Sequence, residues 1–116
     1  MTTLRSNRPE NYVSLILGER MRLENVTKGL ESIVVGLGGR QDWVEGRPLW
    51  ILDFDGDQQL ASLSARLSSE GVLFAGGLAG WPPAAIFEDL RDKGLLQGSF
   101  KEVTWTGPGK WVVRER

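Results

Sequence analysis

The chain contains no cysteine and no histidine among its 116 residues. Without cysteine there are no disulfide bonds, thiolate nucleophiles or thiolate metal sites. Without histidine the usual general base near neutral pH and the commonest ligand of transition metals are missing. Catalytic triads built on serine and histidine, or on cysteine, are therefore excluded. We expect a non-catalytic protein, and we assign it no catalytic residue and no cofactor.

A strong charge of either sign is also lacking. The chain has 14 basic and 15 acidic residues, which gives a net charge of −1. Such a balance creates no field that would attract nucleic acid or an anionic membrane. No stretch approaches the roughly 20 apolar residues of a membrane span, and the first residues have no apolar signal-peptide core. We expect a cytoplasmic protein, bacterial by its size, with neither a membrane nor nucleic acid as its partner.

The composition is that of one ordinary globular domain, with 41% hydrophobic and 25% charged residues. Residues 1–10 are polar and contain Pro9, so they are expected to form a flexible tail. Residues 11–116 are expected to form a single α+β domain.

Residue periodicity predicts both strands and helices in this domain. Leu60, Leu63, Ser64 and Leu67 share one helical face, and a glycine-rich turn at 107–109 separates two strand-like runs. Two stretches are ambiguous: 20–26 also suits a helix, and 32–37 also suits a buried strand. The predicted strands are 12–17, 20–26, 42–45, 49–54, 72–75, 100–106 and 110–115, and the predicted helices are 27–37, 58–69 and 83–93. We expect a mostly antiparallel sheet of about five to seven strands, with two or three helices packed on one face.

The segment PLWILDFDGD, residues 48–57, ends in three closely spaced aspartates. In one interpretation they are structural. Asp53 closes a strand, Asp55 caps the next helix in a capping box with Gln58, and Asp57 lies in the first helical turn, where negative charge is favourable. In the other, Asp53, Asp55 and Asp57 bind a divalent cation and form a ligand-binding or minimal enzyme site.

Two families share parts of this aspartate pattern. An apolar strand followed by D-x-D-G resembles the first motif of the haloacid dehalogenase-like phosphatases, and the resemblance implies a nucleophile at Asp53 and an acid/base at Asp55. The chain departs from that motif at Asp57. The spacing also resembles the calcium loop of EF-hands, with three aspartates at alternate positions. There the chain has Gln58 where the loop needs glycine and Ser64 where it needs glutamate.

Tryptophan is unusually abundant, with five residues at 43, 50, 81, 105 and 111. Trp105 and Trp111 lie at equal distances from the 107–109 turn, which predicts a cross-strand pair. Trp81 and Pro82 follow a glycine-rich loop, where an exposed tryptophan would suit an interface. The candidate partner- or ligand-binding residues are therefore Trp81, Pro82, Trp105 and Trp111, for a protein or a small apolar ligand. Helices on one face of a sheet leave its other face to be covered, which predicts a homodimer.

The last third of the chain allows a further alternative. A helix within 84–96 and two strands around a tight turn resemble the recognition helix and wing of winged-helix DNA-binding domains, which implies DNA binding through residues 84–116. Glu88 and Asp89 in that helix would face phosphates unfavourably. The sequence thus favours a small non-catalytic binding domain that acts as a homo-oligomer. The cation site and winged-helix DNA binding are its alternatives.

Overall fold

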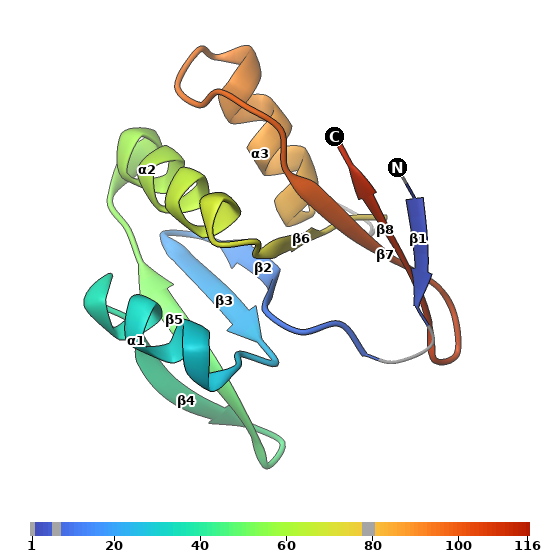
Figure 1. The fold of residues 1–116 in the computed structure, drawn as a ribbon. Helices are drawn as coiled ribbons and strands as arrows, with labels where there is room; N and C mark the ends of the chain where they lie inside the picture. Colours follow the sequence, from blue (N-terminus) through green and yellow to red (C-terminus); the bar gives the residue numbers. More distant parts are fainter. Residues whose placement is uncertain (1, 6–7, 78–80) are drawn as a thin grey trace.

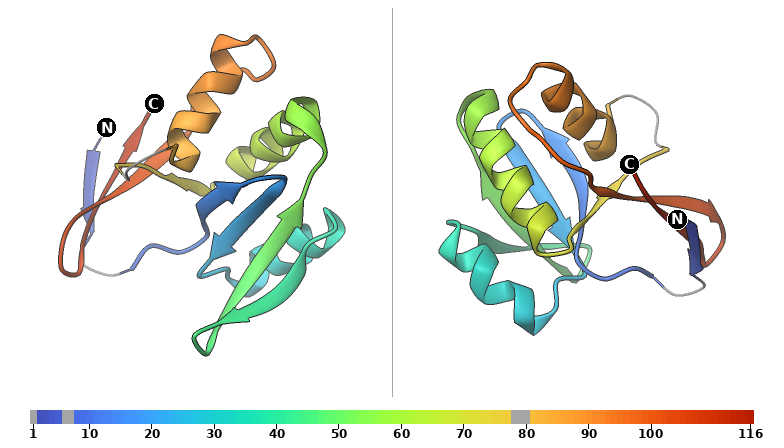
Figure 2. Two further views of the ribbon diagram at one scale, coloured as in Figure 1. Left: turned by 180° about the vertical axis from the view of Figure 1, so that it is seen from behind. Right: turned by 45° about the horizontal axis from the view of Figure 1, so that its top comes forward.

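The computed structural model describes residues 2–5, 8–77 and 81–116. Eight strands form one twisted sheet in the order β1-β8-β7-β6-β2-β3-β5-β4, and three helices lie on one side of it (Figures 1 and 2). The elements are β1 Thr2–Arg5, β2 Tyr12–Leu17, β3 Arg20–Glu24, α1 Lys28–Gly36, β4 Arg40–Val44, β5 Arg47–Asp53, α2 Gly56–Ser69, β6 Leu73–Ala75, α3 Pro83–Asp92, β7 Lys101–Gly107 and β8 Lys110–Glu115.

This architecture confirms the predicted α+β fold. Seven strands lie within residues 11–116, where five to seven were predicted. The sheet is mostly antiparallel, and only β6 pairs in parallel with its neighbours β2 and β7. The two ambiguous stretches are settled, because Arg20–Glu24 is a strand and Lys28–Gly36 is a helix.

A strand lies within the segment that was predicted to be a flexible tail. The backbone of Thr2–Arg5 pairs antiparallel with β8, from Thr2 opposite Arg114 to Arg5 opposite Trp111. The outer edge of β8 offers unpaired amide and carbonyl groups, and an adjacent segment of the same chain can bond to them. The polar composition of residues 1–10 gave no sign of this pairing.

The three helices pack against the sheet through the apolar periodicity seen in the sequence. The α2 helix buries Leu60, Leu63 and Leu67, and α1 buries Leu30 and Val34. These side chains meet the strand residues that point to the same side, and together they form the main core. The strand members of that core include Val13, Met21, Leu23, Leu52 and Phe74.

An aromatic cluster fastens α3 to the sheet. The ring of Phe87 stacks on that of Phe100, with 4.3 Å between centroids, and lies edge-on to Phe74 at 5.1 Å. The Arg91 guanidinium lies over the Phe100 ring, 5.2 Å from its centroid. It also donates hydrogen bonds to the carbonyls of Gly98 and Arg116, both at 3.0 Å. The cluster therefore joins α3 to β6 and to the strand entry before β7.

The arrangement of α3, β7 and β8 is not that of a winged helix. Both strands of the predicted wing belong to the large sheet, since β7 pairs with β6 and β8 pairs with β1. The helix packs on that sheet through Phe87 and Leu90, and Glu88 and Asp89 lie on its more exposed side. The resemblance of residues 84–116 to a winged helix is therefore not borne out by the fold of the described chain.

The side of the sheet opposite the helices, called the open face below, carries no helix (Figure 2). Strand alternation directs every second side chain to it. On β5, for example, Leu49 and Ile51 point to the open face, while Leu52 points into the main core. A second, smaller core of Tyr12, Leu73, Val103 and Val113 lies on the open face over β2, β6, β7 and β8. No helix in the described ranges is long and apolar enough to cross a membrane.

Candidate functional site

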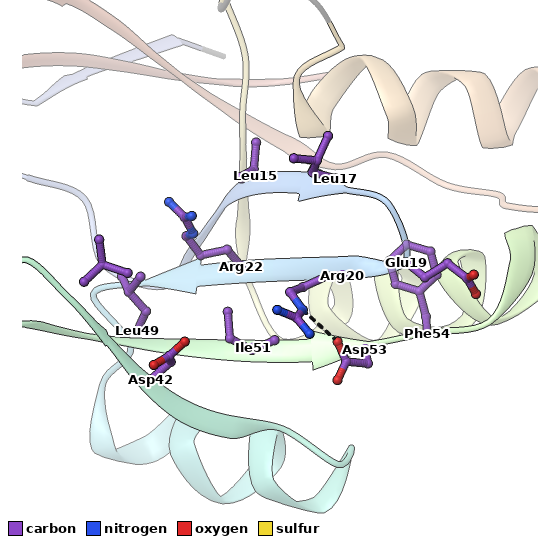
Figure 3. Close-up of a pocket in the computed structure, with 11 residues that line it drawn as sticks. Leu15, Leu17, Glu19, Arg20, Arg22, Asp42, Leu49, Ile51, Asp53 and Phe54 are labelled. Carbon is purple, nitrogen blue, oxygen red and sulfur yellow. Dashed lines mark hydrogen bonds and ion pairs between the residues drawn. The ribbon is translucent and has the colours of Figure 1, made fainter.

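A groove of about 700 Å³ lies on the open face over β2, β3, β5 and β4 (Figure 3). Six of its eleven lining residues are apolar and five are charged, because β2 and β5 present leucine and isoleucine to the groove while β3 presents Arg20 and Arg22. Leu17 is 71% exposed at the end of β2, whereas Ile51 lies on the floor of the groove and is only 5% exposed. The apolar lining residues are Leu15, Leu17, Val44, Leu49, Ile51 and Phe54. A hollow of this size and lining can accept apolar side chains of a partner.

The charged residues of the groove differ in whether they are paired. Arg20 donates to Asp53 at 3.0 Å, and Arg40 binds the second oxygen of the same carboxylate. Arg22 and Asp42 form no ion pair with any residue that the structure describes, although both line the groove. Asp42 Oδ1 accepts only the backbone N–H of Trp43, at 2.8 Å. Figure 3 shows the two side chains on opposite sides of Leu49 and Ile51. Among the described residues, the groove therefore presents the unpaired cation Arg22 opposite the unpaired anion Asp42 across an apolar floor, and a second unpaired anion, Glu19, at its end.

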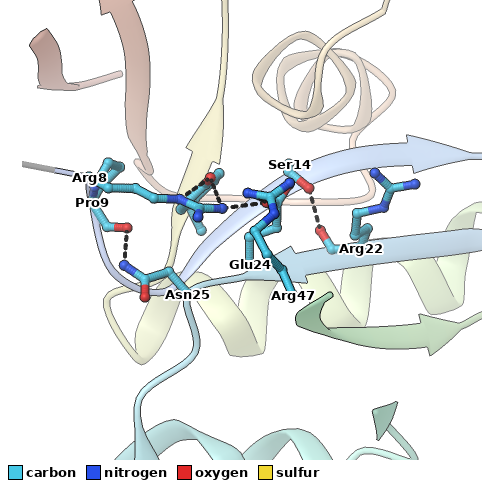
Figure 4. Close-up of polar contacts among 8 residues, drawn as sticks. Arg8, Pro9, Ser14, Arg22, Glu24, Asn25 and Arg47 are labelled. Atoms are coloured by element: carbon cyan, nitrogen blue, oxygen red, sulfur yellow. Dashed lines mark hydrogen bonds and ion pairs between the residues drawn. The ribbon is translucent and has the colours of Figure 1, made fainter. Parts of the chain in front are cut away.

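A polar cluster separates the groove from the rest of the open face (Figure 4). Glu24 is buried and accepts from Arg8 at 2.5 Å, and Arg47 lies 3.5 Å from the same oxygen. Arg8 also donates to the Tyr12 hydroxyl at 3.1 Å, and burial raises the pKa of that phenol. Arg8, Glu24 and Tyr12 satisfy one another and make the cluster structural, while the two arginines exceed the single carboxylate by one positive charge, which the exposed Arg47 presents to solvent.

Trp105 and Trp111 lie on the other part of the open face. They are direct partners in the β7–β8 ladder, which confirms the predicted cross-strand pair. Trp111 packs on Tyr12 with 6.2 Å between ring centroids, while Trp105 stays 58% exposed. They line a hollow of about 400 Å³ together with Tyr12, Ser14, Glu24, Ala75, Gly76 and Val103. The open face is thus apolar on both sides of the Glu24 cluster.

Trp81 and Pro82 do not belong to this surface. They line a different hollow, beside α3, together with Glu88, Asp89 and Asp92. Trp81 is 65% exposed there, and Pro82 directly precedes the first residue of α3. The four tryptophan and proline residues that the sequence grouped as one binding set are therefore divided between two sides of the sheet.

The structure gives each of the three aspartates a different environment. Asp53 is held by Arg20 and Arg40, and Asp57 lies 3.3 Å from the Lys93 ammonium. Asp55 precedes α2, but its side chain makes no capping bond; instead, its backbone N–H donates to Gln59. The predicted capping box of Asp55 with Gln58 is therefore wrong: the Asp55 side chain makes no capping bond, and its backbone N–H is bound by Gln59 in place of Gln58. Among the residues that the structure describes, no three metal-binding side chains gather in one place.

The pairing of Asp53 predicts a pH-dependent contribution to stability. The Arg40 guanidinium, followed by that of Arg20, lowers the pKa of Asp53. A carboxyl with a lowered folded-state pKa stabilises the fold above its unfolded pKa of about 4, and this contribution is lost as pH falls through the folded value. Wild type should therefore melt at a higher temperature than Asp53→Asn at pH 7, and the difference should shrink toward zero as the pH is lowered below about 4. Because the pair is exposed, the difference should be small.

The measurement is a series of thermal melts between neutral and acidic pH. Asp55→Asn is the matched control, since Asp55 forms no ion pair with any other described residue. Its melting temperature should follow that of wild type at every pH. A constant difference between wild type and Asp53→Asn across the series would contradict the proposed role of the two arginines.

Sequence reasoning missed Arg22 and Asp42. They lie 20 residues apart, on strands that flank β5 on either side. Only the ladder order β3-β5-β4 brings them to one groove, and the sequence pattern carries no signal of that order. The alternation of arginine with apolar residues in RMRLE does indicate which β3 side chains avoid the core. A comparison of the chain with protein-family models, with curated proteins and with solved structures finds no match.

Proposed function

We propose that the chain is a non-catalytic interaction domain that forms a homodimer through the open face of its sheet. The single observation that carries this proposal is the apolar character of that face. An antiparallel sheet that meets water on one side normally alternates apolar and polar residues, with the polar ones outward. Here the outward positions of β2, β5, β7 and β8 include Leu15, Leu17, Leu49, Ile51, Trp105 and Trp111, while those of β3 hold Arg20, Arg22 and Glu24.

The exposed members of this set suit an interface. Leu17 on β2 and Trp105 on β7 are 71% and 58% exposed, and only β6 lies between these two strands. Exposed apolar patches rimmed by charge, such as the two on either side of the Glu24 cluster, are typical of a binding site on a protein that folds alone. A rigid aromatic side chain such as Trp105 loses little conformational freedom when a partner covers it.

A second copy is the partner that the charges favour. The unpaired arginine and the unpaired aspartate of the described chain face each other across the groove floor, and Glu19 adds a further unpaired anion at the end of the groove, so the surface carries charges of both signs. A two-fold symmetric contact joins a surface to itself and therefore needs such self-complementarity. The near-neutral net charge of the chain, −1, also imposes little repulsion between copies.

The test is the solution mass of the purified chain. At tens of micromolar, light scattering coupled to gel filtration should give twice the 12.9 kDa of one chain. Leu15→Lys and Val44→Lys should each shift the mass to that of a monomer, because both residues line the groove. Lysine keeps an apolar stem with a solvated end, so the isolated fold should tolerate it.

The matched control is Ser62→Lys, at an exposed position of α2 on the other side of the molecule. It should remain a dimer with an unchanged melting temperature. A monomeric wild type at these concentrations would overturn the proposed function. A dimer that both groove variants leave intact would show that another surface joins the copies.

A further inference from the structure

We propose that Arg22 of each chain pairs with Asp42 of the partner subunit, and that these two ion pairs set the register of the homodimer. This inference rests on the proposed function and deepens it, since it names the contacts by which the second copy is recognised. The observation behind it is the set of unpaired charges in the groove. Of the five charged residues that line it, Arg20 and Asp53 pair with each other, and three form no ion pair with a described residue: Arg22 and Asp42, which flank the floor, and Glu19, which lies at the end beside the β2–β3 turn.

The strand pairing explains why Arg22 and Asp42 do not bind each other within one chain. Arg22 on β3 is level with Ile51, and Asp42 on β4 is level with Leu49 on the other side of β5. With strands about 4.8 Å apart and about 3.4 Å per residue, the two backbones are roughly 12 Å from each other. The apolar side chains of Leu49 and Ile51 fill the space between them. Neither charge is matched within its own chain, and Arg22 is half-buried among apolar neighbours.

A two-fold axis between two copies of the chain gives Arg22 and Asp42 a partner at the same time. The line from Arg22 to Asp42 crosses β5 between Ile51 and Leu49. The two-fold axis runs parallel to the open face, directly above this crossing point, and perpendicular to the line. Rotation about it exchanges the positions of Arg22 and Asp42. It places Arg22 over Asp42 of the partner subunit, and Asp42 over the partner's Arg22. Leu49 and Ile51 then face their own copies at the centre.

The same operation also matches apolar residues. Leu15 is level with Arg22 on the next strand outward, and Val44 lies one outward position beyond Asp42 on β4. Exchange of the two ends therefore brings Leu15 toward the partner's Val44. One geometry thus accounts for both charges that flank the floor and for the partly exposed aliphatic residues at the two sides of the groove. Desolvated ion pairs between subunits fix orientation and exclude wrong registers, which is the role inferred here.

Charge reversal tests the pairing directly. Arg22→Glu and Asp42→Arg should each raise the dimer dissociation constant at least about tenfold, because each places like charges together twice. The double variant Arg22→Glu/Asp42→Arg should return the dissociation constant to within a few-fold of wild type. The measurement is sedimentation velocity over a concentration series, with thermal melts to confirm that every variant is folded.

Matched controls reverse one charge of each sign outside the groove. Lys28→Glu at the start of α1 and Asp92→Arg at the end of α3 are exposed, and both place the new charge favourably for the helix. Neither should change the dissociation constant. If the single reversals weaken the dimer but the double variant does not restore it, Arg22 and Asp42 do not face each other and the inference is wrong.

Failure of the inference is distinguishable from failure of the proposed function. Charge reversals without effect, in a dimer that Leu15→Lys dissociates, would overturn the ion pairs and leave the open-face dimer standing. A wild type that is monomeric would overturn both.

Discussion

Replacing Phe87 by alanine should lower the free energy of unfolding by about 3–5 kcal/mol, a loss expected for a fully buried aromatic residue. Phe87 is 1% exposed, and its ring touches both Phe74 and Phe100. The truncation removes the stacked partner of Phe100 and leaves a cavity between α3 and the sheet. For a domain of this size the loss is a large part of the total stability.

Urea denaturation followed by tryptophan fluorescence measures this effect. Phe87→Leu should cost clearly less than the alanine variant, because leucine refills most of the cavity. Ile86→Ala, one residue away and only half-buried, should also cost less. Equal losses for Phe87→Ala and Ile86→Ala would contradict the central position of the aromatic cluster.

The sequence predicted the elements well because each has a strong local signal. The leucine spacing of α2, the β-branched run of β2 and the turn at 107–109 all report on neighbours within a few residues. Local patterns do not predict which strands pair with each other. The short strand β6 lies between β2 and β7, pairs in parallel with both, and is separated from each by tens of residues. No local pattern specifies that insertion, and the pairing of β1 with β8 is equally non-local.

The residues of the candidate site likewise differ in whether a local sequence pattern predicts their contacts. The Trp105–Trp111 pair was predictable, since both residues flank one hairpin turn. The aspartates of residues 53–57 attract attention as a group in the sequence, but their partners Arg20, Arg40 and Lys93 come from three distant segments. A cluster of like charges in sequence thus becomes a set of separate ion pairs in the fold. The groove on the open face exists only once β4, β5, β3 and β2 are placed side by side.

Glu102 is the most deeply buried carboxylate of the described chain, at 4% exposure, and its two oxygens have separate partners. Oε1 accepts from Arg114 at 2.9 Å, and Oε2 accepts from Arg116 at 2.9 Å. Gly76 leaves the space that the carboxylate occupies, because a Cβ at that position would lie 2.0 Å from Oε2. The glycine and the two arginines together make it possible for β7 to bury a charge beneath the loop that follows β6.

Replacing both arginines by methionine should therefore destabilise the protein by about 3–5 kcal/mol, since the buried Glu102 then loses its compensation and the partly exposed Glu88 loses its partner Arg116. Methionine keeps the apolar stems of Arg114 and Arg116 in place, so the loss reports on the charges rather than on packing. The triple variant Arg114→Met/Arg116→Met/Glu102→Met should recover most of the stability, because the deeply buried carboxylate is removed together with its two arginines and only the partly exposed Glu88 is left without a partner. Urea denaturation of the three proteins at one pH compares them directly. A triple variant as unstable as the double one would show that the side-chain shapes at this site, and not the unpaired carboxylate, carry the loss.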